Sequence, residues 1–405
     1  MIFIVRVSDS ERLSYSHKIF INVKIFDSMK TGLYAILTFL MSLGFAGETL
    51  YAQEFTAQEN GVIPVLYAEE TELLGVVCHL AGIGGYDFSE EEGVLPDYLS
   101  DVESHFAASK DHKAVRFARK QLYRKGFSYD MPMAFALRLR IKDSHICRKD
   151  SLVADYDGYY DRLSRSDETE FISLLEDFYR ESSFAEFFDS HRGLYRECED
   201  AMRKVVDNLD IEWYDSFFGP KRDSGFRVYL GLLNGPGNYA VHQKLTDGGE
   251  IINAVMGCCD RDEEGRIYYG EVYTMPILVH EFNHSYCNPL NEEIWDSIAD
   301  KAEAIFNENA DFYGSIAYGA PEYLMNEMFV EASVIRYLMT HPIDLTGTGF
   351  EDMQSLTERL LEVDEQQKKF VLVRKMVEAL GVRESSYDIY PAMRDFMPVL
   401  YRMVL

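Results

Sequence analysis

The sequence feature that most constrains this chain is the pentapeptide HEFNH, residues 280–284, inside an otherwise uncharged run. On a helix, side chains four residues apart share a face, so both imidazoles could reach one metal ion. Glu281 would project about 100° away, where it can contact a water on the ion without binding the ion. Two neutral imidazoles and an open position for water are typical of catalytic zinc. The pentapeptide therefore predicts a buried helix with His280 and His284 as zinc ligands and Glu281 as general base.

A catalytic zinc also needs a third protein ligand. The next histidine after His284 is His341, too far along for an extended histidine motif, so a carboxylate on a later helix is expected. The competing carboxylates are Glu292, Glu293, Glu303, Glu308, Glu322, Glu327 and Glu331. The helix expected over Pro321–Thr340 is the best carrier, because Glu327 and Glu331 lie beside its apolar stripe, where an unpaired carboxylate is costly. The residues alone do not decide whether Glu327 or Glu331 is the third ligand.

Apolar periodicity divides the chain into helices, a small sheet and more helices. Helical spacing predicts helices over residues 101–126, 131–141 and 168–189, the last with an aromatic stripe that belongs to the core. Short β-rich runs over 226–233, 250–257 and 266–273 favour a small, mostly antiparallel sheet. Further helices are expected over 275–287, which Asn288-Pro289 should end, and over 292–309, 321–340, 353–380 and 392–403. This order indicates an α+β fold.

The first fifty residues have a different composition. Lys30 follows Met29 and precedes an apolar run of sixteen residues, 32–47, of which three are glycine. A basic start, an apolar run and small residues before a cut are typical of a secretory signal peptide, with cleavage between Ala52 and Gln53. The alternative is a membrane anchor, but the run is shorter than the about 20 residues that span a bilayer. We therefore expect an exported protein, periplasmic or secreted, with no stable membrane insertion after signal removal.

Three segments follow from these patterns. Residues 1–52 are expected to be an upstream extension and signal peptide, 53–210 a helical N-terminal portion, and 211–405 the portion with the pentapeptide. The last two should form one continuous structural unit. The chain has 40 Lys and Arg against 68 Asp and Glu, a formal net charge of −28. Because nucleic-acid affinity depends on clustered Lys and Arg, this charge excludes nucleic acid as a partner.

The pentapeptide and a later segment together resemble a known pattern. His280-Glu281-x-x-His284 followed by Asn326-Glu327-x-x-x-Glu331 resembles the gluzincin pattern of thermolysin-like metallopeptidases, HExxH and then N-E-x-x-x-[D/A]. The resemblance implies a zincin-like catalytic portion over 211–405, and it assigns the roles residue by residue. It implies zinc (Zn²⁺) bound by His280, His284 and Glu327, Glu281 as general base, and Glu331 as a carboxylate that orients a ligand histidine.

The spacing departs from that pattern in two ways. Glu327 lies 43 residues after His284, farther than in thermolysin-like enzymes, and Glu331 replaces the usual Asp or small residue. Both departures keep Glu331 as the alternative third ligand. The stretch HEFNHSYCNP also resembles an uncharacterised family, a domain of unknown function, of exported bacterial proteins assigned to the gluzincin-like superfamily.

The resemblance has further implications for substrate and mechanism. It implies a peptide or protein substrate, and a downstream Tyr or His that stabilises the oxyanion, for which Tyr387 and Tyr390 are candidates. It also implies a sheet edge that pairs with extended substrate, for which residues 226–233 with the turn over 234–239 are the candidate. The expected function is that of a zinc-dependent metallopeptidase. The alternative is a catalytically silent zincin-fold module with a binding or structural role in the cell envelope.

Overall fold

The computed structural model describes residues 62–88, 95–149, 153–154, 159–220, 224–235, 237–257, 260–262, 264–316 and 318–405. The expected extension and signal peptide over 1–52, with the cleavage site after Ala52, lie outside the described residues. The described part is α+β, as predicted: it is mostly helical and contains a small mixed sheet. All the described residues belong to one compact unit.

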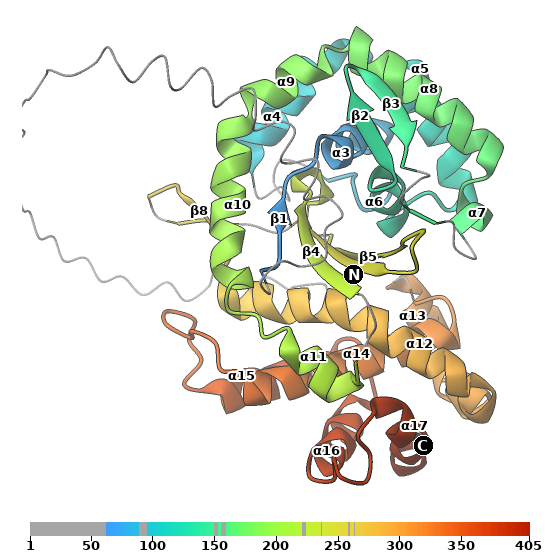
Figure 1. Ribbon diagram of the computed structural model, residues 1–405, viewed down its shortest axis with the longest axis vertical. Coiled ribbons are helices and arrows are strands. Elements are labelled where there is room, and N and C mark those ends of the chain that lie inside the picture. Colours follow the sequence, from blue (N-terminus) through green and yellow to red (C-terminus); the bar gives the residue numbers. More distant parts are fainter. Residues whose placement is uncertain are drawn as a thin grey trace, which may run out of the picture. The chain divides into compact units, whose positions relative to one another are not determined.

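The main sheet has the strand order β1-β4-β6-β5 (Figure 1). Its strands are β1 (Val65–Leu66), β4 (Ser224–Leu230), β5 (Tyr239–Lys244) and β6 (Glu250–Met256). β1 pairs with β4 and β4 with β6 in parallel, and only β5 and β6 are antiparallel. The expectation of a mostly antiparallel sheet is therefore wrong. The chain inserts β6 between β4 and β5, and it adds β1 from a segment far upstream.

Two strand-like segments behave differently from the prediction. Of the expected third strand, only β8 (Ile267–Tyr268) forms, and it pairs with β7 (Asp260–Arg261) outside the main sheet. The expected helix over 131–141 stops early, and β2 (Leu139–Lys142) then pairs with β3 (His145–Arg148). Positive φ at both turn residues, 51° at Asp143 and 61° at Ser144, makes this a tight hairpin. The short alternation of buried and exposed residues in β2 was hidden within a helix-like pattern.

The N-terminal helices surround an aromatic core. They are α3 (Glu69–Ala81), α4 (Pro96–His105), α5 (Lys113–Phe117), α6 (Asp130–Ala136), α7 (Tyr159–Arg162), α8 (Arg165–Glu181), α9 (Phe184–Ser190), α10 (Arg192–Val206) and α11 (Glu212–Phe218). The predicted aromatic stripe is confirmed as core: Phe171 stacks on Phe135 and Phe178 on Phe106, all four buried. The expected helix over 168–189 is divided between α8 and α9, because Ser183 adopts a left-handed conformation with φ of 55°.

The helix that contains the pentapeptide is longer than expected. α12 (Glu271–Asn307) continues for 37 residues through Pro276 and Pro289, so the expected end at Asn288-Pro289 is wrong. A proline inside a helix removes one hydrogen bond and costs about 3 kcal/mol. Both sides of Pro289 are nevertheless held by packing, since Cys287 and Leu290 are buried in the core. Burial of an apolar face supplies most helix stability in proteins, and here it overrides the local stop signal.

The remaining helices complete the C-terminal part of the chain. They are α13 (Ala310–Ser315), α14 (Pro321–Thr340), α15 (Met353–Gln366), α16 (Val373–Glu384) and α17 (Met393–Val404). α14 has the predicted bounds, whereas the helix expected over 353–380 is divided into α15 and α16. α14 packs along α12 and thereby faces the pentapeptide. Among the helices of the described residues, none has both the length and the apolar character required to cross a bilayer.

Candidate metal centre

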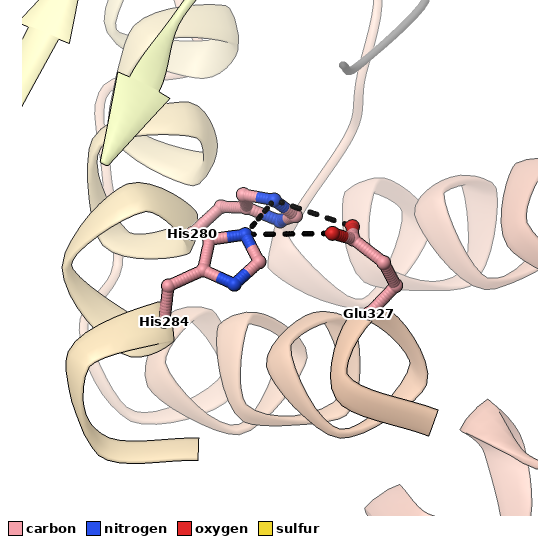
Figure 2. Close-up of side chains that lie close together, drawn as sticks. All are labelled: His280, His284 and Glu327. Atoms are coloured by element: carbon pink, nitrogen blue, oxygen red, sulfur yellow. Dashed lines mark hydrogen bonds and ion pairs between the residues drawn. The ribbon is translucent and has the colours of Figure 1, made fainter. Parts of the chain in front are cut away.

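Three side chains from two helices point toward one another in Figure 2: His280 and His284 from α12, and Glu327 from α14. The Nε2 atoms of the two histidines lie 3.1 Å apart. Glu327 Oε2 lies 3.6 Å from His280 Nε2, and Glu327 Oε1 lies 3.5 Å from His284 Nε2. The structure thus brings together the three residues predicted to bind zinc. We call them the ligand cluster.

The spacing of these atoms suits a tetrahedral zinc site. Zinc holds nitrogen and oxygen ligands at about 2.0–2.2 Å, which separates tetrahedral neighbours by about 3.3–3.6 Å. The two nitrogens are 3.1 Å apart, and they lie 3.6 Å from Glu327 Oε2 and 3.5 Å from Glu327 Oε1, all close to this range. Imidazole nitrogens favour zinc and its transition-metal neighbours over calcium or magnesium, which prefer oxygen ligands. The donor set and its spacing therefore fit zinc.

The outer ring nitrogens indicate how the histidines are oriented. His284 Nδ1 lies 3.3 Å from Asn288 Oδ1, and His280 Nδ1 lies 3.5 Å from Glu331 Oε1. Because both Nδ1 atoms face oxygen acceptors, each ring favours the tautomer with its proton on Nδ1. Both Nε2 lone pairs then face each other and the carboxylate of Glu327. Three electron-rich atoms at this spacing are favourable around a cation.

The charges around His280 also favour a cation at this position. Burial alone would lower the pKa of His280, but the carboxylates of Glu331 and Glu327 outweigh burial and raise that pKa. The position between these side chains therefore attracts positive charge. Glu331 contributes from the outer side of the ring, away from the Nε2 atom that faces Glu327.

A lysine holds Glu331 in that outer position. Lys368 Nζ donates to Glu331 Oε1 at 2.5 Å and lies 2.7 Å from Asp364 Oδ1, the last a residue of α15. All three side chains are buried or nearly so, and we call them the charged cluster. Burial would raise the pKa of Glu331, but the charge of Lys368 outweighs burial and holds that pKa well below its usual range. Glu331 is therefore a carboxylate paired with lysine, 3.5 Å from His280 Nδ1.

Glu281 is a buried carboxylate of a different kind. Only 4% of the residue is exposed, yet within the described part of the chain no hydrogen bond or ion pair engages its carboxylate. Glu281 directly follows His280, so a carboxylate without an ion pair among the described residues lies where it can accept a proton. Tyr239, the first residue of β5, is near enough to respond to it. Burial raises the pKa of Tyr239, and the charges of Asp130 and Glu281 raise it further, so this phenol stays protonated.

The family of the chain follows from comparison with known proteins. The model of a family described as Domain of unknown function (DUF4932) matches residues 72–403. The chain belongs to the DUF4932 family. The matched stretch begins within α3 and includes the whole of α12 and α14, hence both clusters. No curated protein and no solved structure matches this DUF4932 chain.

Four side chains of this DUF4932 site were not found from the sequence. Tyr318, just before α14, donates from its hydroxyl to Glu327 Oε2 at 3.3 Å. Burial and the charge of Glu327 raise the pKa of Tyr318, so it remains a donor. The others are Asn288, Asp364 and Lys368. The sequence could have indicated Asn288, because it lies one helical turn after His284. The other three come from outside α12, and no local sequence pattern marks them.

Two predicted features lie elsewhere in the DUF4932 fold. Tyr387 lies against the Arg383 guanidinium, 4.8 Å from ring centre to carbon, and Tyr390 packs on Phe396 at 5.3 Å. Among the described residues, neither contacts the ligand cluster. The prediction that residues 226–233 form the substrate-binding edge of the sheet is also wrong. Residues 226–233 contain β4, which lies between β1 and β6, and the edge next to β6 is β5.

Proposed function

We propose that this protein is a zinc-dependent metallopeptidase of the gluzincin type that hydrolyses peptide or protein substrates. The observation that carries the proposal is the ligand cluster, in which three side chains can each offer one donor atom to the same ion, beside the buried carboxylate of Glu281. Structural zinc sites use four protein ligands, whereas catalytic sites use three and keep one position open. Within the described residues, the cluster has three members.

The chemistry divides among the ion and the side chains around it. When bound, a zinc ion polarises a peptide carbonyl and lowers the pKa of coordinated water to about 7. Glu281 accepts the proton of the attacking water and passes it to the leaving amine. No ion pair within the described chain competes for this carboxylate. Glu327, His280 and His284 hold the ion, while Glu331 and Asn288 keep the two rings oriented.

Tyr318 is the proposed oxyanion donor in place of Tyr387 or Tyr390. Its hydroxyl lies 3.3 Å from Glu327 Oε2, an atom that itself lies 3.6 Å from His280 Nε2. The hydroxyl is therefore beside the ligand cluster, where it could donate to a substrate oxygen. A preorganised donor in a buried site stabilises developing negative charge more than the ground state.

The edge strand β5 is the proposed docking place for substrate backbone. An edge strand offers one row of backbone groups to an added strand, as in β-augmentation. One end of this edge is already used, because Lys244 O accepts from Ala154 N at 2.8 Å. By alternation, Ala240 presents its backbone groups to the same outer side. The N-terminal half of β5 is therefore the half proposed to pair with substrate.

Metal analysis and one substitution test the proposal. Purified protein should contain about one zinc, and Glu281→Gln should keep the metal while losing the general-base contribution, about 10²–10⁴-fold in peptidase rate. Metal-free protein that cleaves as well as the zinc form would refute the proposal. The other outcome is zinc retention with no cleavage across a broad peptide library, together with lower heat stability after chelation. That result would favour the catalytically silent binding or structural module of the cell envelope.

The proposed site of action is outside the cytoplasm. The support is the apolar run over 32–47 with small residues before Gln53. N-terminal sequencing of the protein recovered from cell fractions tests this. A mature chain that begins near Gln53 is expected, and an uncleaved chain in the cytosol would refute export.

A further inference from the structure

α12 and α14 run past each other where they carry the ligand cluster. His280 faces Glu331 and His284 faces Glu327, so each turn forward on α12 meets one turn backward on α14. A second pair of contacts is also antiparallel, but it advances eight residues on α12 for four on α14. Asn283 Nδ2 donates to the Val330 carbonyl at 3.4 Å, and Asn291 Nδ2 donates to Asn326 Oδ1 at 2.9 Å. The two helices are therefore antiparallel through the site.

The next residues along these two helix faces are Asn288 on α12 and Tyr323 on α14. Asn288 is four residues after His284, and Tyr323 is four residues before Glu327, so each lies one turn farther along the face that carries the ligand. Exposure increases in this direction. The side chain of His280 is 2% exposed and that of His284 17%, whereas Tyr323 is 59% exposed. This end of the two helices is thus the more exposed one.

Asn288 and Tyr323 both have unused binding capacity. Asn288 turns its Oδ1 toward His284, and within the described chain no acceptor is seen for its amide nitrogen. Tyr323 makes no hydrogen bond or ring contact with the described residues, although it is a large aromatic side chain in the first turn of α14. A single exposed aromatic residue needs no explanation by itself. Tyr323, however, lies one turn from a ligand carboxylate, at the more exposed end of the site.

We propose that Tyr323 is a specificity-determining residue that selects substrates with a large apolar or aromatic side chain beside the scissile bond. The proposal rests on the proposed function. Side chains one turn apart on a helix have Cβ atoms about 5–6 Å apart, and an extended peptide advances about 3.3–3.4 Å per residue. The ring of Tyr323 therefore reaches the substrate residue adjacent to the reacting carbonyl. The amide of Asn288 donates to that residue's backbone carbonyl, and the ring packs on its side chain.

Two small chelators test the selection without any knowledge of the natural substrate. L-Phenylalanine hydroxamate and L-alanine hydroxamate carry the same zinc-binding group and differ only in the side chain beside it. Calorimetry on the zinc-loaded full chain should give about tenfold tighter binding of the phenylalanine compound. Tyr323→Ala should reduce this ratio to near one and leave the affinity for the alanine compound unchanged. Tyr323→Phe should keep the ratio, because the ring supplies the contact.

A matched control uses an equally accessible tyrosine away from the ligand cluster. Tyr268 on β8 is 41% exposed, and Tyr268→Ala should leave the ratio as in the wild type. A wild type without preference for the phenylalanine compound, or a preference that survives Tyr323→Ala, overturns the inference and leaves the proposed function standing. Failure of both hydroxamates to bind the zinc-loaded chain would mean that the metal has no open position, and it would overturn both.

Discussion

Glu327 and Glu331 are the same residue type, one turn apart on the same helix, yet they meet opposite surroundings. Glu327 faces two imidazole nitrogens, and no cation contacts it within the described residues. Glu331 faces the outer nitrogen of His280 and is bonded to the ammonium group of Lys368. The ligand cluster thus lacks positive charge, whereas the charged cluster contains its own. The comparison teaches that the residue opposite each carboxylate, rather than its helix position, decides which of the two can serve a metal ion.

Removal of the Glu327 carboxylate should have the largest effect on metal binding. Glu327→Gln keeps the shape of the side chain and its contact with Tyr318 but removes the anionic ligand. Zinc affinity, measured by competition with a chelator, should fall by more than the about 10–100-fold expected when only an outer residue is changed. The control is Glu322→Ala on the exposed side of the same helix, which should bind zinc as the wild type does. Undiminished zinc affinity in Glu327→Gln would contradict the assignment of Glu327, rather than Glu331, to the metal ion.

Removal of the lysine should affect folding instead. Lys368→Met leaves Glu331 and Asp364 buried without their cation, and breaking a buried ion pair in this way costs about 3–5 kcal/mol. The free energy of unfolding from urea titration should fall by about this amount. Lys301→Met, which changes an exposed lysine of α12, should stay within about 0.5 kcal/mol of the wild type. Equal stability of the two variants would show that Lys368 does not hold the charged cluster together.

The sequence predicts the parts of this site that depend on local periodicity. The spacing of His280 and His284 implies a shared helix face, and α14 has the predicted bounds. The choice between Glu327 and Glu331 is not local, because it depends on how α12 and α14 align although Glu327 lies 43 residues after His284. Lys368 is still farther away, and only the packing of the chain end after α15 brings it to Glu331. Contacts of this kind leave no pattern in one sequence.

The errors in the predicted fold have the same origin. The parallel pairing of β1 with β4 joins segments far apart in the chain, whereas turn-separated strands suggest a simple antiparallel order. Pro289 is a local stop signal that packing on both of its sides overrides. In each case a short-range rule was outweighed by burial that becomes visible only in three dimensions. The prediction of the aromatic stripe as core was right because its helical periodicity and its burial agree.

The smallest of the expected effects decides between the two glutamates. Glu331→Gln keeps an oxygen near His280 Nδ1 but removes the charge that fixes the ring, so zinc affinity should fall about 10–100-fold. The same chelator competition measures it, and the loss must be smaller than that of Glu327→Gln. The reverse order, with Glu331→Gln as the more damaging change, would mean that Glu331 leaves Lys368 and becomes the third ligand. Since Lys368 is bonded to Glu331 at 2.5 Å, that exchange would have to break an existing buried ion pair. Glu327, which has no such partner to lose, is therefore the expected ligand.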